Sequence, residues 1–195
     1  GGVGERDYSV TIARNFLFSA LMLPLWEALC GSRDTALAGI AAKSAKETQY
    51  HLRHSHDWLV RMGDGTSESH RRSQAALDDL FSFTQEFWTP APFETQALDL
   101  GVAADVRAMQ GHWSERVQAT LAEATLRHPD PQGHVPTGKL GVHSEHLTYL
   151  LAEMQSLARA HPGATLARNG PAACHRPTGV HAPLPAAGRC THGRV

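Results

Sequence analysis

Apolar residues recur at intervals of three and four along five long stretches of this chain, and no alternation of apolar and polar residues persists anywhere. Intervals of three and four place side chains on one side of an α-helix, whereas side chains alternate between the two faces of a strand. The stretches cover residues 7–29, 34–62, 66–88, 103–126 and 140–161. Long helices with short connections favour antiparallel neighbours, so the pattern predicts an all-α fold, an antiparallel helical bundle.

Residues that start and stop helices lie at the ends of these stretches. Asp34 and Thr66 carry side-chain oxygens that can accept from the free N–H groups of a first helical turn. Glycines in residues 63–65 and prolines in residues 89–92 predict helix ends. Pro24 lies inside the first stretch, where we expect it to bend the helix or break it locally.

The charge of the chain is nearly balanced overall but unevenly distributed. The 195 residues have a net charge of -1, yet residues 164–195 carry +4 with no Asp or Glu, and the remainder carries -5. Residues 164–195 are also poor in large apolar side chains, so we predict a helical domain over residues 1–163 and a disordered tail over 164–195. The small net charge gives no reason to expect nucleic acid as a partner.

Membrane insertion and disulfides are not expected either. No unbroken apolar run approaches the roughly 20 residues that a membrane helix needs. The three cysteines, Cys30, Cys174 and Cys190, are odd in number and widely spaced, which argues against a disulfide scaffold and indicates the reducing cytoplasm.

The second stretch raises the question of a di-iron site. Such a site in a ferritin-like bundle takes a Glu from two helices and a Glu-x-x-His pair from two others. Here Glu47 is followed three residues later by Tyr50, and His51 comes one residue further on. A phenol is a poor replacement for imidazole on iron, and the first stretch has no carboxylate between Asp7 and Glu27. We therefore expect Glu47, Tyr50 and His51 to form a buried or half-buried hydrogen-bonding cluster, with a working metal site as the alternative.

Two further groups of side chains are candidates for contact with a partner. His54 and Trp58 share one side of the second stretch with His51. His143, Glu145 and His146 lie at the start of the last stretch; the histidine pair could bind zinc, but its spacing is not that of His-Glu-x-x-His. For the first group, packing against another helix or subunit is favoured over a pH-sensitive or ligand-contacting face. For the second group, a solvated or partner-facing role is favoured over zinc.

Four separated blocks then carry a family resemblance. They are RDYSVTIARNFL at residues 6–17, AAKSAKETQYHLRH at 41–54, GDGT with SHRR within 63–72, and GVHSEHL with LAEMQ within 141–155. The chain resembles the PaaC-type subunit of ring-1,2-phenylacetyl-CoA epoxidase, of the phenylacetic acid catabolic protein family. The blocks occur in the family's order, and the resemblance covers about residues 5–165.

The resemblance implies a ferritin-like fold and a role in aerobic phenylacetate catabolism in the cytoplasm. It implies a non-catalytic structural subunit without a metal or cofactor of its own, which binds the catalytic PaaA-type oxygenase subunit and other subunits of the epoxidase. The di-iron centre would belong to that partner. Electrons would come from NADPH through a separate reductase with FAD and an iron-sulfur cluster, and no nucleic acid or membrane would take part.

Two departures from the family qualify this expectation. The family begins with two further helices that have no counterpart in this sequence, so we expect an N-terminally truncated bundle with exposed helix faces and poor solubility or compensating association. The tail over residues 164–195 has no counterpart in the family. Two other functions stay open: a di-iron carboxylate oxygenase active in its own right and, less favoured, a helical acyl-CoA-binding module.

Overall fold

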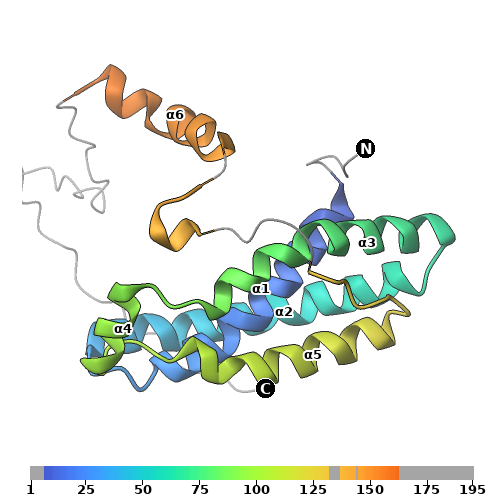
Figure 1. Cartoon of the computed structure of the whole chain (residues 1–195), viewed down its shortest axis with the longest axis horizontal. Coiled ribbons are helices and arrows are strands. Elements are labelled where there is room, and N and C mark those ends of the chain that lie inside the picture. The colour runs from blue at the N-terminus through green and yellow to red at the C-terminus, as the bar shows by residue number, and fades with distance from the viewer. Residues whose placement is uncertain (1–6, 132–136, 144, 163–195) are drawn as a thin grey trace, which may run out of the picture. The chain divides into compact units, whose positions relative to one another are not determined.

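The computed structural model describes residues 7–131, 137–143 and 145–162 (Figure 1). These residues form α-helices and short 3-10 helices, with no strand among them; the single ladder contact they contain is an isolated bridge between Thr137 and Val142. The predicted all-α class is confirmed. The α-helices are α1 (Tyr8–Leu29), α2 (Thr35–Gly63), α3 (Ser67–Leu80), α4 (Pro92–Asp99), α5 (Gln110–Glu123) and α6 (Glu145–Ala160), and the 3-10 helices are η1 (Phe81–Trp88), η2 (Val106–Met109) and η3 (Gly138–Leu140).

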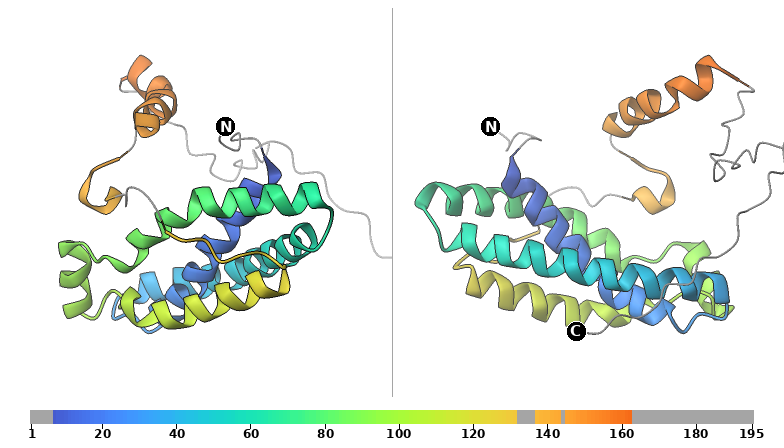
Figure 2. Two further views of the ribbon diagram at one scale, coloured as in Figure 1. Left: turned by 45° about the vertical axis from the view of Figure 1, so that its right-hand side comes forward. Right: turned by 180° about the vertical axis from the view of Figure 1, so that it is seen from behind.

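Residue contacts divide the chain into two units, Gly1–Thr148 and Tyr149–Val195. In the first unit α1, α2, α3 and α5 run alongside one another, and α4 lies at one end of this group (Figures 1 and 2). The boundary falls within α6. The described part of the second unit is residues 149–162, and no residue of α6 is buried. The predicted tail over residues 164–195 lies outside the described residues, and the predicted domain boundary stays a prediction.

The helix α1 forms the centre of the first unit. It packs against α2, α3 and α5. Its buried residues occur on most of its circumference: Ser9, Ile12, Ala13, Phe16, Leu17, Ser19, Ala20, Leu21 and Leu23. The helix continues through Pro24, so the predicted local break does not occur.

The same helix is also the most apolar long segment of the fold. Among the described helices, α1 is the one long and apolar enough to cross a membrane, by length and composition alone. Scattered polar residues and Pro24 interrupt its apolar run, which is why no membrane-length segment stands out in the sequence. The core helix of a soluble protein and an N-terminal signal sequence pass the same test, and in this structure α1 packs against its neighbours.

The contact between α1 and α5 is fixed by Trp113. Its ring is buried, and its indole Nε1 donates a 3.1 Å hydrogen bond to the carbonyl oxygen of Leu17. Phe81, Phe87 and Trp88 surround this ring, with centroid distances of 6.0, 6.3 and 5.3 Å. Edge-to-face and tilted aromatic pairs at these distances stabilise a core beyond the burial of their area.

The ends of α2 agree with the sequence. The Asp34 carboxylate accepts from the N–H groups of Ala36 and Leu37 at 2.9 and 3.1 Å, as expected of an N-cap. The helix ends at Gly63, which lies close to the backbone of Ala124 at the end of α5. The C-terminal end of α2 therefore packs so close to Ala124 that a side chain at position 63 would not fit.

The third stretch begins as predicted and then changes its winding. Thr66 and Ser69 form a reciprocal capping box at the start of α3. Hydrogen bonds from Arg71 and then Arg72 hold the pKa of the exposed Glu68 below its ordinary value, and Arg72 also reaches Asp7 at 3.7 Å. The helix predicted to run to Trp88 is wrong in its last eight residues, since η1 has 3-10 winding.

Three other elements differ from the prediction. The helix expected over residues 103–126 consists of η2 followed by α5, and the unpredicted α4 starts with Pro92 as its first residue. The last helix starts at Glu145, not near Leu140, because Gly141 has a left-handed φ of 84° that closes η3 and stops helical continuation.

The two glycines of α2 generate a matched prediction. A Cβ at Gly39 meets no atom within 4 Å, whereas a Cβ at Gly63 would overlap the carbonyl oxygen of Ala124. Gly39→Ala should raise the free energy of unfolding by about 0.5–1 kcal/mol, because alanine loses less backbone entropy in a helix. Gly63→Ala should lower it by about 1–3 kcal/mol through overpacking. Urea unfolding followed by circular dichroism at 222 nm measures both, and effects of the same sign would contradict this account.

The hydrogen bond from the Trp113 indole leads to a second prediction about stability. Trp113→Phe removes the donor to Leu17 and part of a buried ring, so the free energy of unfolding should fall by about 1–3 kcal/mol. Trp88→Phe is the control, because Trp88 is half-buried and its indole nitrogen has no hydrogen bond among the described residues. The control should lose less than about 1 kcal/mol. Equal losses in the same urea titration would show that the hydrogen bond is not the decisive contact.

Candidate functional site

The outward side of α2 carries three aromatic rings at intervals of four residues, Tyr50, His54 and Trp58, here called the aromatic row. The centroids of the Tyr50 and His54 rings lie 6.1 Å apart with an interplanar angle of 18°, and those of His54 and Trp58 lie 6.4 Å apart at 60°. Residues four apart are neighbours on a helix surface, so the sequence interval itself aligns the rings.

Two residues that the sequence did not single out extend the aromatic row. The Tyr8 ring of α1 meets the Trp58 ring edge-on, with centroids 5.6 Å apart at 87°. The guanidinium carbon of Arg61 lies 5.7 Å from the centroid of the Trp58 ring, within the range of a cation–π contact. Arg61 lies three residues after Trp58 and seven after His54, on the same side of the helix. This spacing is the sequence signal that could have identified it.

The aromatic row is accessible within the first unit. Tyr50 is 58% exposed, while His54 and Trp58 are half-buried, and Trp58 also packs against the core. Exposed aromatic side chains with one polar edge are the type that most often supplies affinity at protein interfaces. The row can therefore act as a recognition surface.

The structure corrects the expectation for Glu47, Tyr50 and His51. All three are exposed, and no hydrogen bond links them, so the predicted buried or half-buried hydrogen-bonding cluster is wrong. The reason is the orientation of α2, which turns Leu52 and Leu59 toward the core and these three residues away from it. The Tyr50 and His51 rings only approach edge-on, with centroids 5.8 Å apart.

The same three residues do not fit a metal ion. Within the described part of the chain, no group of three or more His, Cys, Asp or Glu side chains is placed to hold a metal. Glu47 and His51 come from one helix, and α1 supplies no carboxylate between Asp7 and Glu27. A di-iron site requires carboxylates from several helices, and no residue of another helix joins Glu47 and His51 in such a group among the described residues.

The second predicted group lies at the start of α6. His143 precedes the helix and lies beside Gly138, where a Cβ would be 3.2 Å from its ring. Glu145 and His146 are exposed in the first turn of α6, and Ser144 lies outside the described residues. The structure does not bring His143 and His146 into a metal-binding group, and their role in partner contact stays a prediction.

The segment before α6 is attached to η1 and α4 by Lys139. Its backbone N–H donates to Glu86 Oε1 at 2.7 Å, and its Nζ lies 3.1 Å from Glu94 Oε1. The Lys139 and Glu94 side chains are both half-buried. This attachment fixes the segment that Gly141 separates from α6.

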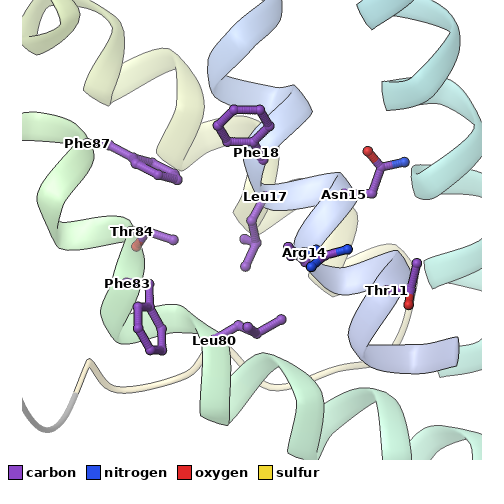
Figure 3. Close-up of a pocket in the computed structure, with 9 residues that line it drawn as sticks. All are labelled: Thr11, Arg14, Asn15, Leu17, Phe18, Leu80, Phe83, Thr84 and Phe87. Carbon is purple, nitrogen blue, oxygen red and sulfur yellow. The ribbon is translucent and has the colours of Figure 1, made fainter. Parts of the chain in front are cut away.

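An apolar groove lies between α1 and η1 (Figure 3). It encloses about 610 Å³, with Leu17 and Phe18 on one side and Leu80, Phe83 and Phe87 on the other. Phe18 and Phe83 are 51% and 56% exposed. No signal in the sequence identifies this groove, because it depends on how the 3-10 winding of η1 places its phenylalanines against α1.

Comparisons with known proteins agree with the fold and the blocks described above. The family model described as "Phenylacetic acid catabolic protein" matches residues 3–165. The chain is also 41% identical over 157 residues to a protein of Escherichia coli (strain K12) that is named as a subunit of 1,2-phenylacetyl-CoA epoxidase. That match covers 80% of this chain and 63% of the relative, so the chain spans less than two thirds of the relative's length. The chain belongs to the phenylacetic acid catabolic protein family, whose fold is ferritin-like.

Proposed function

We propose that this chain is a non-catalytic subunit of a multicomponent phenylacetyl-CoA ring 1,2-epoxidase in aerobic phenylacetate catabolism. It binds and stabilises the catalytic oxygenase subunit. The 41% identity to a protein named as one subunit of such an enzyme supports the assignment, and that name implies further subunits.

One observation carries the non-catalytic role. The side of α2 on which a ferritin-like enzyme would need Glu-x-x-His presents Glu47, Tyr50 and His51 to solvent, with no carboxylate facing them from α1. The same side holds the aromatic row. A homologue that has lost its metal-binding residues keeps a helix face suited to packing. That face can then bind the partner subunit.

The remaining parts of the proposal concern the partner proteins. The di-iron centre is assigned to the PaaA-type oxygenase subunit, and NADPH, FAD and an iron-sulfur cluster to a separate reductase. This chain contributes no cofactor, and the complex is placed in the cytoplasm. His54 and Trp58 are the interface candidates on α2, and His143, Glu145 and His146 are those near the start of α6.

The proposal predicts that Tyr50→Ala weakens binding to the oxygenase subunit. Removal of an exposed aromatic anchor typically costs more than 1 kcal/mol at an interface, so we expect the Kd of the purified pair to rise about fivefold or more. Phe93→Ala is a matched control, because Phe93 is 59% exposed on α4 against 58% for Tyr50. The control should change the Kd less than twofold, as measured by isothermal titration calorimetry.

Iron analysis separates this proposal from the catalytic alternative. The chain purified alone should contain less than about 0.2 iron per chain after expression with added iron, while the co-purified pair should contain iron. Two bound irons per isolated chain, or failure of the wild-type chain to bind the oxygenase subunit, would contradict the proposed function.

A further inference from the structure

A basic cleft lies beside the aromatic row, between α1, α2 and α5. It encloses about 670 Å³ and is lined by Lys46 and Arg53 from α2 and by Arg116 from α5. The one carboxylate in its lining is Glu27, an exposed residue near the end of α1. Tyr50 lines the cleft as well and so belongs to both surfaces.

The three cations of the cleft have no carboxylate partner in the part of the chain that the structure describes. None of Lys46, Arg53 and Arg116 forms an ion pair with a described residue. Arg116 donates from Nη2 to His112 Nε2 at 3.1 Å, while its Nε is buried without an acceptor. Clustered cations without counter-charges disfavour the folded state, so an external anion would relieve both the repulsion and the missing acceptors.

His56, the fourth basic side chain in the lining, is already engaged. Its Nε2 lies 3.3 Å from Glu123 Oε2 and its Nδ1 3.3 Å from Asp57 Oδ1. With His56 set aside, three cations against Glu27 leave an excess of two positive charges. Residues 1–148, the unit that contains the cleft, carry a net charge of -5 from 13 Lys and Arg against 18 Asp and Glu, so the cleft is a local exception on an acidic unit.

The placement of these cations favours a protein side chain over a free phosphate. Many phosphate sites add backbone N–H groups at helix N-termini or in turns to their cationic side chains. Every residue in the cleft lining belongs to α1, α2 or α5 beyond the first turn, where backbone N–H groups are already bonded within the helix. The cleft therefore offers an anion side-chain donors but no free backbone N–H group.

The spacing of the cations defines the shape of the partner. Lys46 and Arg53 are seven residues apart on α2, which is two turns and about 10 Å along the axis. Carboxylates two turns apart on a facing helix have the same repeat. The floor of the cleft is the hydrocarbon of Phe16, Leu23 and Leu52, against which the stems of Glu side chains can pack.

We propose that the basic cleft receives an acidic helix of the oxygenase subunit, whose carboxylates pair with Lys46, Arg53 and Arg116. This inference rests on the function proposed above, binding of the oxygenase subunit. It adds that ion pairs recognise this partner. The aromatic row then packs beside the same partner helix, because Tyr50 is shared between the two surfaces.

Charge variants of the full chain, titrated with the oxygenase subunit, test the proposal. Lys46→Gln together with Arg53→Gln should raise the Kd at least tenfold and flatten its dependence on NaCl concentration, since two ion pairs are lost. Lys43→Gln is the control: Lys43 is exposed on the same helix and does not line the cleft, and its Kd should change less than twofold. Glu27→Gln should lower the Kd, because it removes the carboxylate that competes for the cations.

The outcomes separate the two proposals. If the wild-type chain forms no complex, the proposed function fails. If the complex forms and the Lys46 and Arg53 variant binds as the wild type does, or no more weakly than the Lys43 control, the cleft assignment alone is overturned. Saturable binding of inorganic pyrophosphate to the isolated chain that leaves complex formation unaffected would also overturn it, by assigning the cleft to a free anion. Thermal unfolding of each variant checks that it is folded.

Discussion

The hydrogen bond from Trp113 to the carbonyl of Leu17 joins two helices whose contacting residues are 96 positions apart in the chain. It sets the depth at which α5 lies against α1, because the indole can donate only from one position of the ring. The aromatic side chains of η1 then pack around that ring, and the end of α5 meets Gly63 at the end of α2. The core of the first unit is thus held together through contacts that converge on α1.

The parts of the fold that could be predicted from the sequence depend on local signals. Asp34 and Thr66 cap the helices that follow them, and the apolar intervals of α1 and α2 are long enough to identify the helices without tertiary information. The winding of η1 and the turn before α6 depend on distant contacts instead. Lys139 reaches Glu86 and Glu94 across about fifty residues of chain, and no pattern near Lys139 indicates this.

The candidate site also has features that the sequence predicts and features that depend on tertiary packing. The sequence predicted His54 and Trp58 on one side of a helix together with His51. In the structure the Tyr50 ring, not that of His51, stacks on His54 and continues the row to Trp58. The exposure of Glu47 and His51 could not be predicted, because it depends on how α2 is rotated about its axis when it packs against α1. The approach of Arg116 to the cations of α2 is likewise a result of tertiary packing, since these residues are more than sixty positions apart.

The aromatic residues around Trp113 also have an optical consequence. Trp88 and Trp113 lie with ring centroids 5.3 Å apart at an interplanar angle of 64°, close enough for their electronic transitions to couple. A coupled indole pair in a fixed, chiral arrangement gives a near-ultraviolet circular dichroism signal that disappears when the rings separate. Trp58, on the outward side of α2, contributes fluorescence sensitive to whatever covers that helix. Besides Trp26 on α1, the chain therefore contains one intrinsic reporter of its core and another of the outward side of α2.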